Sequence, residues 1–182
     1  MSQRANLSVK MIVMGAGGVG KTSLVNQYVH QRFHKNYLQT LGEDVYSKSL
    51  AVAARSMDVR IHDLAGQEKF KNLRQTYMRG AQLGLAVYDL TAPQSLDILR
   101  EEWFPDLTTL LAGQPFYLSV VGNKCDLDRR VKPEMGNVVR NYLRKHYPYI
   151  QVHQVLETSA LTSENVQVAF DELVKAYVQS LT

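Results

Sequence analysis

The chain has 182 residues, of which 45% are hydrophobic and 21% charged, values typical of one globular domain with a buried core. The single cysteine, Cys125, excludes an intrachain disulfide, and no apolar run is long enough to predict a transmembrane helix. The first ten residues lack the apolar stretch of a signal peptide, so we expect a cytoplasmic protein. The net charge of +4 includes a basic stretch over 129–145, which we interpret as a solvated helix face rather than a nucleic-acid site.

The first predicted elements are a buried strand over 9–15 and an amphipathic helix over 21–33, joined by "GAGGVGKTS". The spacing of Gly15, four residues and then Gly20-Lys21-Thr22 fits a phosphate-binding loop. Glycines let N–H groups at a helix start approach phosphate oxygens, Lys21 adds a cation, and the Thr22 hydroxyl can ligate Mg²⁺. A plain glycine-rich turn is the alternative. The predicted phosphate-binding residues are Gly15, Gly17, Gly18, Val19, Gly20, Lys21, Thr22 and Ser23.

The remaining segments alternate between strands and helices. Further strands are predicted over 43–52, 57–66, 83–90, 116–124 and 150–160, and further helices over 93–112, 133–147 and 163–181. This order predicts one α/β domain over 1–182, with a core of about 7–181, built on a mostly parallel six-stranded sheet with helices on both faces. The phosphate loop and the stretches "DLAGQ", "NKCD" and "ETSA" each follow a strand, so they are expected to meet at the carboxyl edge of the sheet.

In this order and at these spacings, "GAGGVGKTS", "DLAGQEKF", "NKCD" and "ETSA" resemble the Ras-like small GTPases over about Leu7 to Leu181. The stretch "YMRGAQLGLAVYDLT" is most similar to the Rab branch. The resemblance implies a P-loop domain that binds GTP and GDP with Mg²⁺, hydrolyses GTP slowly, and acts as a monomeric switch in membrane traffic or signalling. Its implied partners are effector proteins, an exchange factor and a GTPase-activating protein, all contacting the switch regions.

The "NKCD" motif predicts that the base is guanine. Guanine presents N1–H and a 2-amino group side by side, and the Asp126 carboxylate can accept from both, whereas adenine would leave it unpaired at a cost of about 1–3 kcal/mol. By resemblance, Asn123 braces the pocket, Lys124 lies along the base and the Ala160 N–H faces the guanine O6. Leu161 replaces a lysine that is common in the family. The predicted guanine-pocket residues are Asn123, Lys124, Asp126, Ser159, Ala160 and Leu161.

The stretch "FHKNYLQT" corresponds to the first switch. Thr40 lies nineteen residues after Lys21, and the resemblance implies that it ligates Mg²⁺ and contacts the γ-phosphate. The resemblance also implies that Phe33 packs edge-on against guanine and that Tyr37 closes over the phosphates. A surface threonine at position 40 and a core phenylalanine at position 33 are the alternatives.

The stretch "DLAGQEKF" corresponds to the second switch. The resemblance implies that Asp63 holds Mg²⁺ through a water, that the Gly66 N–H bonds the γ-phosphate, and that Gln67 orients the attacking water. Gln67 is a neutral amide and a poor base, so its expected role is positioning, while an exposed loop glutamine is the alternative. Departures from the Rab pattern occur at Val45, His62 and Leu64, in a patch that reads effectors in Rabs.

Two other functions share parts of these motifs. A P-loop ATPase or nucleotide kinase would share the phosphate loop but has no use for "NKCD", and a non-hydrolysing GTP-binding module would keep the pocket without working switches. No arginine is expected near enough to the phosphate loop to supply transition-state charge, so a partner is expected to supply it. The sequence has no C-terminal cysteine, so we expect either an unprenylated protein or a lipidated tail beyond these residues.

Overall fold

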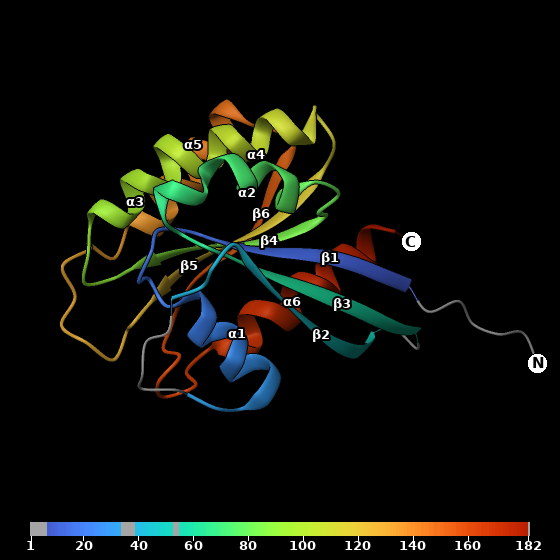
Figure 1. The fold of residues 1–182 in the computed structure, drawn as a ribbon, viewed down its shortest axis with the longest axis horizontal. Coiled ribbons are helices and arrows are strands. Elements are labelled where there is room, and N and C mark those ends of the chain that lie inside the picture. The colour runs from blue at the N-terminus through green and yellow to red at the C-terminus, as the bar shows by residue number, and fades with distance from the viewer. Residues whose placement is uncertain (1–6, 34–38, 53–54, 182) are drawn as a thin grey trace, which may run out of the picture.

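The computed structural model describes residues 7–33, 39–52 and 55–181 as one central sheet with helices on both faces (Figure 1). The strands are β1 (Leu7–Met14), β2 (Glu43–Val52), β3 (Arg55–Leu64), β4 (Leu83–Asp89), β5 (Phe116–Asn123) and β6 (Ile150–Thr158). They lie in the order β2-β3-β1-β4-β5-β6, and every neighbouring pair is parallel except the antiparallel β2–β3 pair. The predicted fold class is confirmed.

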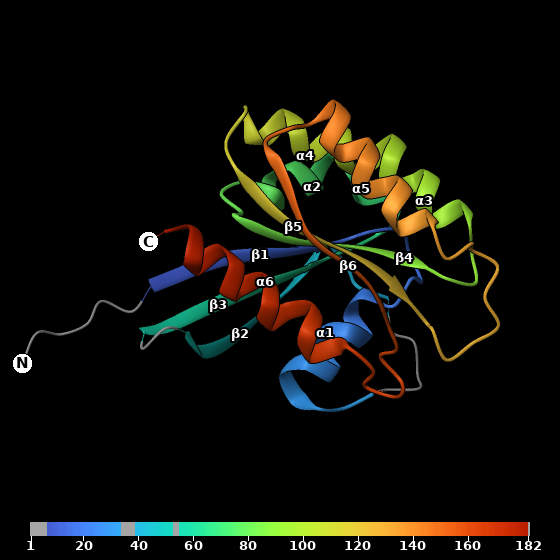
Figure 2. The same cartoon turned by 180° about the vertical axis from the view of Figure 1, so that it is seen from behind.

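Two layers of helices cover the sheet. The helices are α1 (Lys21–His30), α2 (Lys71–Met78), α3 (Gln94–Ile98), α4 (Phe104–Leu111), α5 (Met135–His146) and α6 (Val166–Ser180), with a 3-10 turn η1 (Glu68–Phe70) and a π-helical segment η2 (Leu99–Trp103). Helices α1 and α6 pack on one face and α2 to α5 on the other, as the front and back views show (Figures 1 and 2). None of the helices within the described ranges is long and apolar enough to cross a membrane.

The alternation of side chains along each strand builds two cores. On β1, Val13 belongs to the core under α1 and α6, and its neighbour Ile12 belongs to the core under α2 to α5. Strand β4 is buried at every position, as expected for a central parallel strand covered on both faces. Residues far apart in sequence join on the first face, where the rings of Tyr28 and Phe170 stack at 4.1 Å and Lys48 Nζ lies 3.7 Å from the centre of the Tyr28 ring.

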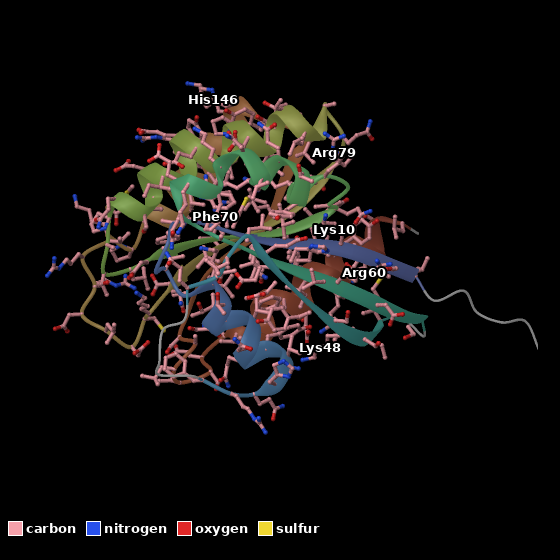
Figure 3. The ribbon with its side chains drawn as sticks, viewed as in Figure 1. Lys10, Lys48, Arg60, Phe70, Arg79 and His146 are labelled. Carbon is pink, nitrogen blue, oxygen red and sulfur yellow. The ribbon has the colours of Figure 1, made fainter. Side chains whose placement is uncertain are left out.

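Several helical segments differ from the sequence predictions. Helix α1 ends at His30, because Gln31 adopts a left-handed backbone with φ of 54° and closes the helix. Helix α2 was not predicted, because its sequence KNLRQTYM is mostly polar and only Arg74 and Met78 are buried. Figure 3 shows Phe70 and Arg79 at the two ends of this helix. The helix predicted over 93–112 is present, but its middle turn is the π-helical segment η2.

Candidate nucleotide-binding site

A cavity of about 500 Å³ lies at the carboxyl edge of the sheet, where the predicted motifs meet. Its volume suits a small-molecule ligand. Of the predicted residues, the wall contains Gly17, Gly18, Gly20, Lys21, Thr22, Ser23, Phe33, Thr40, Gly66, Gln67, Asn123, Lys124, Asp126, Ala160 and Leu161. Gly15, Val19, Asp63 and Ser159 are buried and are not part of this wall, and Tyr37 falls outside the described residues.

The glycines of the phosphate loop are required by close approaches. A Cβ on Gly15 would lie 2.2 Å from the carbonyl oxygen of Val87, and the φ of Gly15 is 143°. A Cβ on Gly20, whose φ is 97°, would lie 2.3 Å from Nδ2 of Asn123. The loop backbone therefore packs against β4 and the "NKCD" asparagine, and its N–H groups begin α1 at the cavity.

Lys21 is a buried cation with carbonyl partners. Its residue is 6% exposed, and Nζ donates to the carbonyl oxygens of Gly15 at 2.9 Å and Ala16 at 2.8 Å. Burial lowers the pKa of Lys21 to about 8, opposed by the nearby Asp63 charge and assisted by that of Arg74. A buried ammonium on two neutral acceptors is suited to take an anionic ligand, because a phosphate oxygen would supply the missing negative charge.

Three oxygen-bearing side chains converge behind the phosphate loop. Thr22 Oγ1 donates to Asp63 Oδ2 at 2.5 Å and lies 2.9 Å from Thr40 Oγ1, which lies 3.4 Å from the same carboxylate oxygen. Asp63 is fully buried, and its Oδ1 has no hydrogen-bond partner among the described residues. Burial raises the pKa of Asp63 to about 6, against the hydrogen bond from Thr22 and the charge of Lys21. Two hydroxyls and a carboxylate with a free oxygen fit the ligand chemistry of Mg²⁺.

The side-chain amide of Asn123 joins three segments of the chain by hydrogen bonds at the other end of the cavity. Its Nδ2 donates to the carbonyl oxygen of Val19 at 2.9 Å. Its Oδ1 accepts from the Thr158 hydroxyl at 3.1 Å and from the Ala160 N–H at 3.3 Å. The residue is 1% exposed, so the phosphate loop, β5 and the "ETSA" loop are joined through one buried amide.

The other motif residues flank this amide. Lys124 has a left-handed φ of 69°, and its Nζ forms a 2.6 Å ion pair with Oδ2 of Asp89. Burial raises the pKa of Asp89, but hydrogen bonds from Lys124 and Thr91 hold it below its ordinary value overall. Asp126 is exposed on the cavity wall, where its carboxylate can meet a ligand, and Leu161 lies on the same wall with 50% of its surface exposed.

Ser159 supports the "ETSA" loop from behind. It is fully buried, and its hydroxyl accepts a hydrogen bond from the Thr162 N–H at 3.0 Å.

The second switch passes close to the phosphate loop. A Cβ on Gly66 would lie 2.4 Å from the carbonyl carbon of Ala16 and from the backbone nitrogen of Gly17. A Cβ on Gly17 would in turn lie 3.7 Å from Cγ of Gln67. Gly66 and Gln67 therefore border the phosphate end of the cavity, at the positions that the sequence predicted for them.

The described residues include both flanks of the first switch, up to Phe33 and from Gln39 onwards. Phe33 is 37% exposed and lies on the cavity wall, so it is not a core residue. Outside the cavity, His62 Nδ1 lies 2.8 Å from Oε2 of Glu43 on the neighbouring strand, and Val45 is exposed beside it. His62 is partly exposed beside Val45, in the altered surface patch that the sequence predicted, whereas Leu64 of the same predicted patch is fully buried and does not belong to it.

Sequence reasoning missed several residues of the site. Asn26, Gln39, Asp44, Tyr46 and Leu127 also line the cavity. Asp89 ends β4 and pairs with Lys124, and Arg74 of α2 donates from Nη2 to the Gly66 carbonyl oxygen at 3.4 Å. For Asp89, the only sequence signal of a functional role was its position at the end of a strand. For Arg74 there was no such signal, because a charged residue is ordinary in a polar helix.

Comparison with known proteins agrees with this geometry. The chain matches the Ras family over residues 10–179. It is 38% identical over 183 residues to Ras-related protein Rab7 of Drosophila melanogaster, covering 96% of this chain and 83% of that protein. It is 37% identical over 182 residues to Rab-7b of Paramecium octaurelia, with the same coverage, and 35% identical over 176 residues to Rab-7b of Bos taurus, covering 95% and 84%. The chain therefore belongs to the Ras family of small GTPases, in its Rab branch, and is a GTP-hydrolysing switch.

Proposed function

We propose that the cavity binds GTP and GDP, with the phosphates at the glycine-rich loop and the guanine at the "NKCD" and "ETSA" loops. The observation that carries this proposal is the convergence on one cavity of a buried lysine, an incompletely satisfied carboxylate and an exposed aspartate beside a preformed amide network. The whole chain acts as a single domain. The idea of a non-hydrolysing module finds no support in the relatives.

At the guanine end, Asp126 accepts from N1–H and the 2-amino group of the base. Asn123 braces the pocket, because both ends of its amide are bonded to protein, and Nδ2 keeps a second N–H that can donate to the base. The Ala160 N–H has only a long 3.3 Å bond to Asn123, so it remains suited to a shared hydrogen bond with the guanine O6. Phe33 supplies an apolar edge against the ring.

At the phosphate end, Lys21 neutralises phosphate charge, and Thr22, Thr40 and Asp63 are the residues that would hold Mg²⁺. The bound metal supplies charge neutralisation for the phosphates. Gln67, beside Gly17, orients the attacking water through its amide. The backbone N–H groups of Gly66 and Thr40 contact the γ-phosphate, so loss of that phosphate releases both switches.

The function of the switch is to present the sheet surface of β2 and β3 and helix α2 to partners in the GTP state only. Effectors, an exchange factor and a GTPase-activating protein are the expected partner classes. The Rab7-named relatives support a role in membrane traffic, on the cytosolic face of a membrane. The exposed Val45 adds an apolar side chain to this surface, and the Glu43–His62 pair adds two polar ones.

Single-turnover hydrolysis of GTP by Gln67→Leu tests the proposal. Loss of the amide is expected to leave GTP affinity unchanged and to slow hydrolysis at least about tenfold, because the water loses its orienting group. Gln75→Leu, at an exposed position of α2, is the matched control and should hydrolyse GTP at the wild-type rate. An unchanged rate in Gln67→Leu would remove Gln67 from the mechanism.

A further inference from the structure

Arg74 is a buried cation of the second switch to which the proposed function gives no role. The residue is 1% exposed and lies on α2, which follows Gly66 and Gln67 after one turn of 3-10 helix. Removing a guanidinium from water is costly unless charged and polar partners replace the water. The contacts of Arg74 therefore indicate what this charge does.

Three groups surround the guanidinium, and two of them belong to η2. Nη1 donates to Oε2 of Glu102 at 3.0 Å, and the centre of the Trp103 ring lies 4.2 Å from Cζ. Nη2 donates to the carbonyl oxygen of Gly66 at 3.4 Å, while Nε is buried without a hydrogen-bond partner among the described residues. The guanidinium thus joins η2 to the glycine at the phosphate end of the cavity.

The π-helical geometry of η2 explains how two adjacent residues contact one cation. A π turn contains an extra residue, which changes the direction of successive side chains relative to an α-helix. Glu102 and Trp103 consequently meet Arg74 together, one by its carboxylate and the other by its ring. Single π turns inside α-helices are rare and occur frequently at functional sites.

Gly66 is the point where this arrangement reaches the nucleotide site. Its backbone lies against the phosphate loop so closely that a Cβ would come within 2.4 Å of Ala16 and Gly17. A close-packed contact of this kind transmits a shift of one segment to the other.

We propose that Arg74 is a positioning residue, whose ion pair with Glu102 holds the Gly66 carbonyl and thereby keeps the second switch in its GTP-binding position. This inference rests on the proposed function, in which the Gly66 N–H contacts the γ-phosphate. The Arg74 side chain is 2% exposed and that of Glu102 is 29% exposed, so Glu102 is the member of the pair that a partner protein reaches. A partner that draws Glu102 away releases the second switch without touching the nucleotide.

The experiment compares Glu102→Gln with Glu101→Gln in the full chain. For each protein, the affinities for GDP and for a non-hydrolysable GTP analogue are measured with Mg²⁺, together with single-turnover hydrolysis of GTP. Glu102→Gln is expected to lower the ratio of analogue affinity to GDP affinity at least about fivefold and to slow hydrolysis. Glu101→Gln removes an adjacent carboxylate that is 66% exposed and paired with Arg100, so its ratio should equal that of the wild type.

Variants at Arg74 separate positioning from simple structural support. Arg74→Lys keeps a cation near Glu102 and should restore part of the ratio that Arg74→Met loses. Adding Glu102→Gln to Arg74→Met should change the ratio no further, because the two side chains act through each other. Glu102→Gln alone decides the question if Arg74→Met does not fold.

Two results would overturn the inference: an unchanged ratio in Glu102→Gln, or an equal fall in both affinities, which indicates structural support only. In either case wild-type binding and hydrolysis of GTP leave the proposed function standing. A wild-type protein that does not bind GTP overturns both proposals.

Discussion

The proposed guanine half and phosphate half of the cavity differ in how the protein satisfies their buried polar groups. In the guanine half, Asn123 uses both ends of its amide on the protein, with hydrogen bonds of 2.9 to 3.3 Å. In the phosphate half, Lys21 has only neutral carbonyl partners, and Asp63 keeps one buried oxygen without a hydrogen bond among the described residues.

This difference suggests that the guanine half determines which base is bound and that the phosphate half determines how tightly the nucleotide is bound. A pocket wall that is already ordered loses little conformational freedom when a base enters, so we expect it to discriminate among bases through the exposed carboxylate of Asp126. Buried charged groups whose hydrogen-bond partners are neutral gain most when a phosphate or a metal arrives. We therefore expect the phosphate half to contribute most of the binding energy, and the guanine half to be ordered by folding before a ligand binds.

The largest expected effect is in the phosphate half. Lys21→Ala should weaken binding of GDP and GTP alike by about 3–5 kcal/mol, or about 150- to 5,000-fold, because it removes a buried cation opposite the phosphates. Equilibrium titration with a fluorescent nucleotide measures both affinities. Lys175→Ala, at an exposed lysine paired with Glu172, is the control and should bind as the wild type does. A loss below about tenfold would contradict the assigned division of energy.

A smaller effect is expected at the guanine end, where base preference should change. Asp126→Asn should favour xanthosine triphosphate over GTP, because the amide accepts from N1–H and donates to the carbonyl that replaces the 2-amino group. Each mismatch costs about 1–3 kcal/mol, or about five- to 150-fold in affinity. Competition binding gives the preference, and Asp128→Asn on the same exposed loop is the control. A variant that keeps the wild-type margin for GTP would show that Asp126 does not recognise the base.

The third prediction concerns stability without nucleotide. Asn123→Ala should lower the free energy of unfolding of the nucleotide-free protein by about 1–3 kcal/mol, because the Val19 carbonyl and the Ala160 N–H lose their buried partner. Urea denaturation measures this change. Asn141→Ala, at an exposed position of α5, should leave stability nearly unchanged. Equal stability of the Asn123 and Asn141 variants would mean that the guanine half is not preformed.

The smallest expected effect is the stability change caused by Thr40→Ala. The Thr40 hydroxyl makes one 2.9 Å contact with Thr22 and one long 3.4 Å contact with Asp63. Its loss should alter the free energy of unfolding of the nucleotide-free protein by no more than about 0.5 kcal/mol. The same variant should need more Mg²⁺ to bind GTP, measured by titration of the metal. A stability loss as large as that of Asn123→Ala would remove the contrast between the two halves.

Sequence reasoning predicted the parts of the fold and site that depend on local patterns. Gly15 and Gly20 could be recognised from the sequence because the close approach of neighbouring atoms leaves no room for a side chain at either position. Buried strands such as β4 could be recognised as apolar runs. Arg74 and Asp89 were missed because their roles depend on partners 28 and 35 residues away, Glu102 and Lys124. Pairs of residues so far apart produce no periodic pattern in the sequence. A polar helix such as α2 is likewise hard to predict because it is stabilised by its tertiary contacts.

Trp103, beneath the guanidinium of Arg74, is the only tryptophan in the sequence. Fluorescence excited in the indole and not in the tyrosines therefore comes from one fully buried ring, which is contacted by a guanidinium of the second switch. The emission of an indole depends on the charges and the water around it. The tryptophan fluorescence of the unlabelled protein should therefore depend on the position of α2. Its change after GTP addition, followed by stopped flow, would give the rate of any movement of this helix.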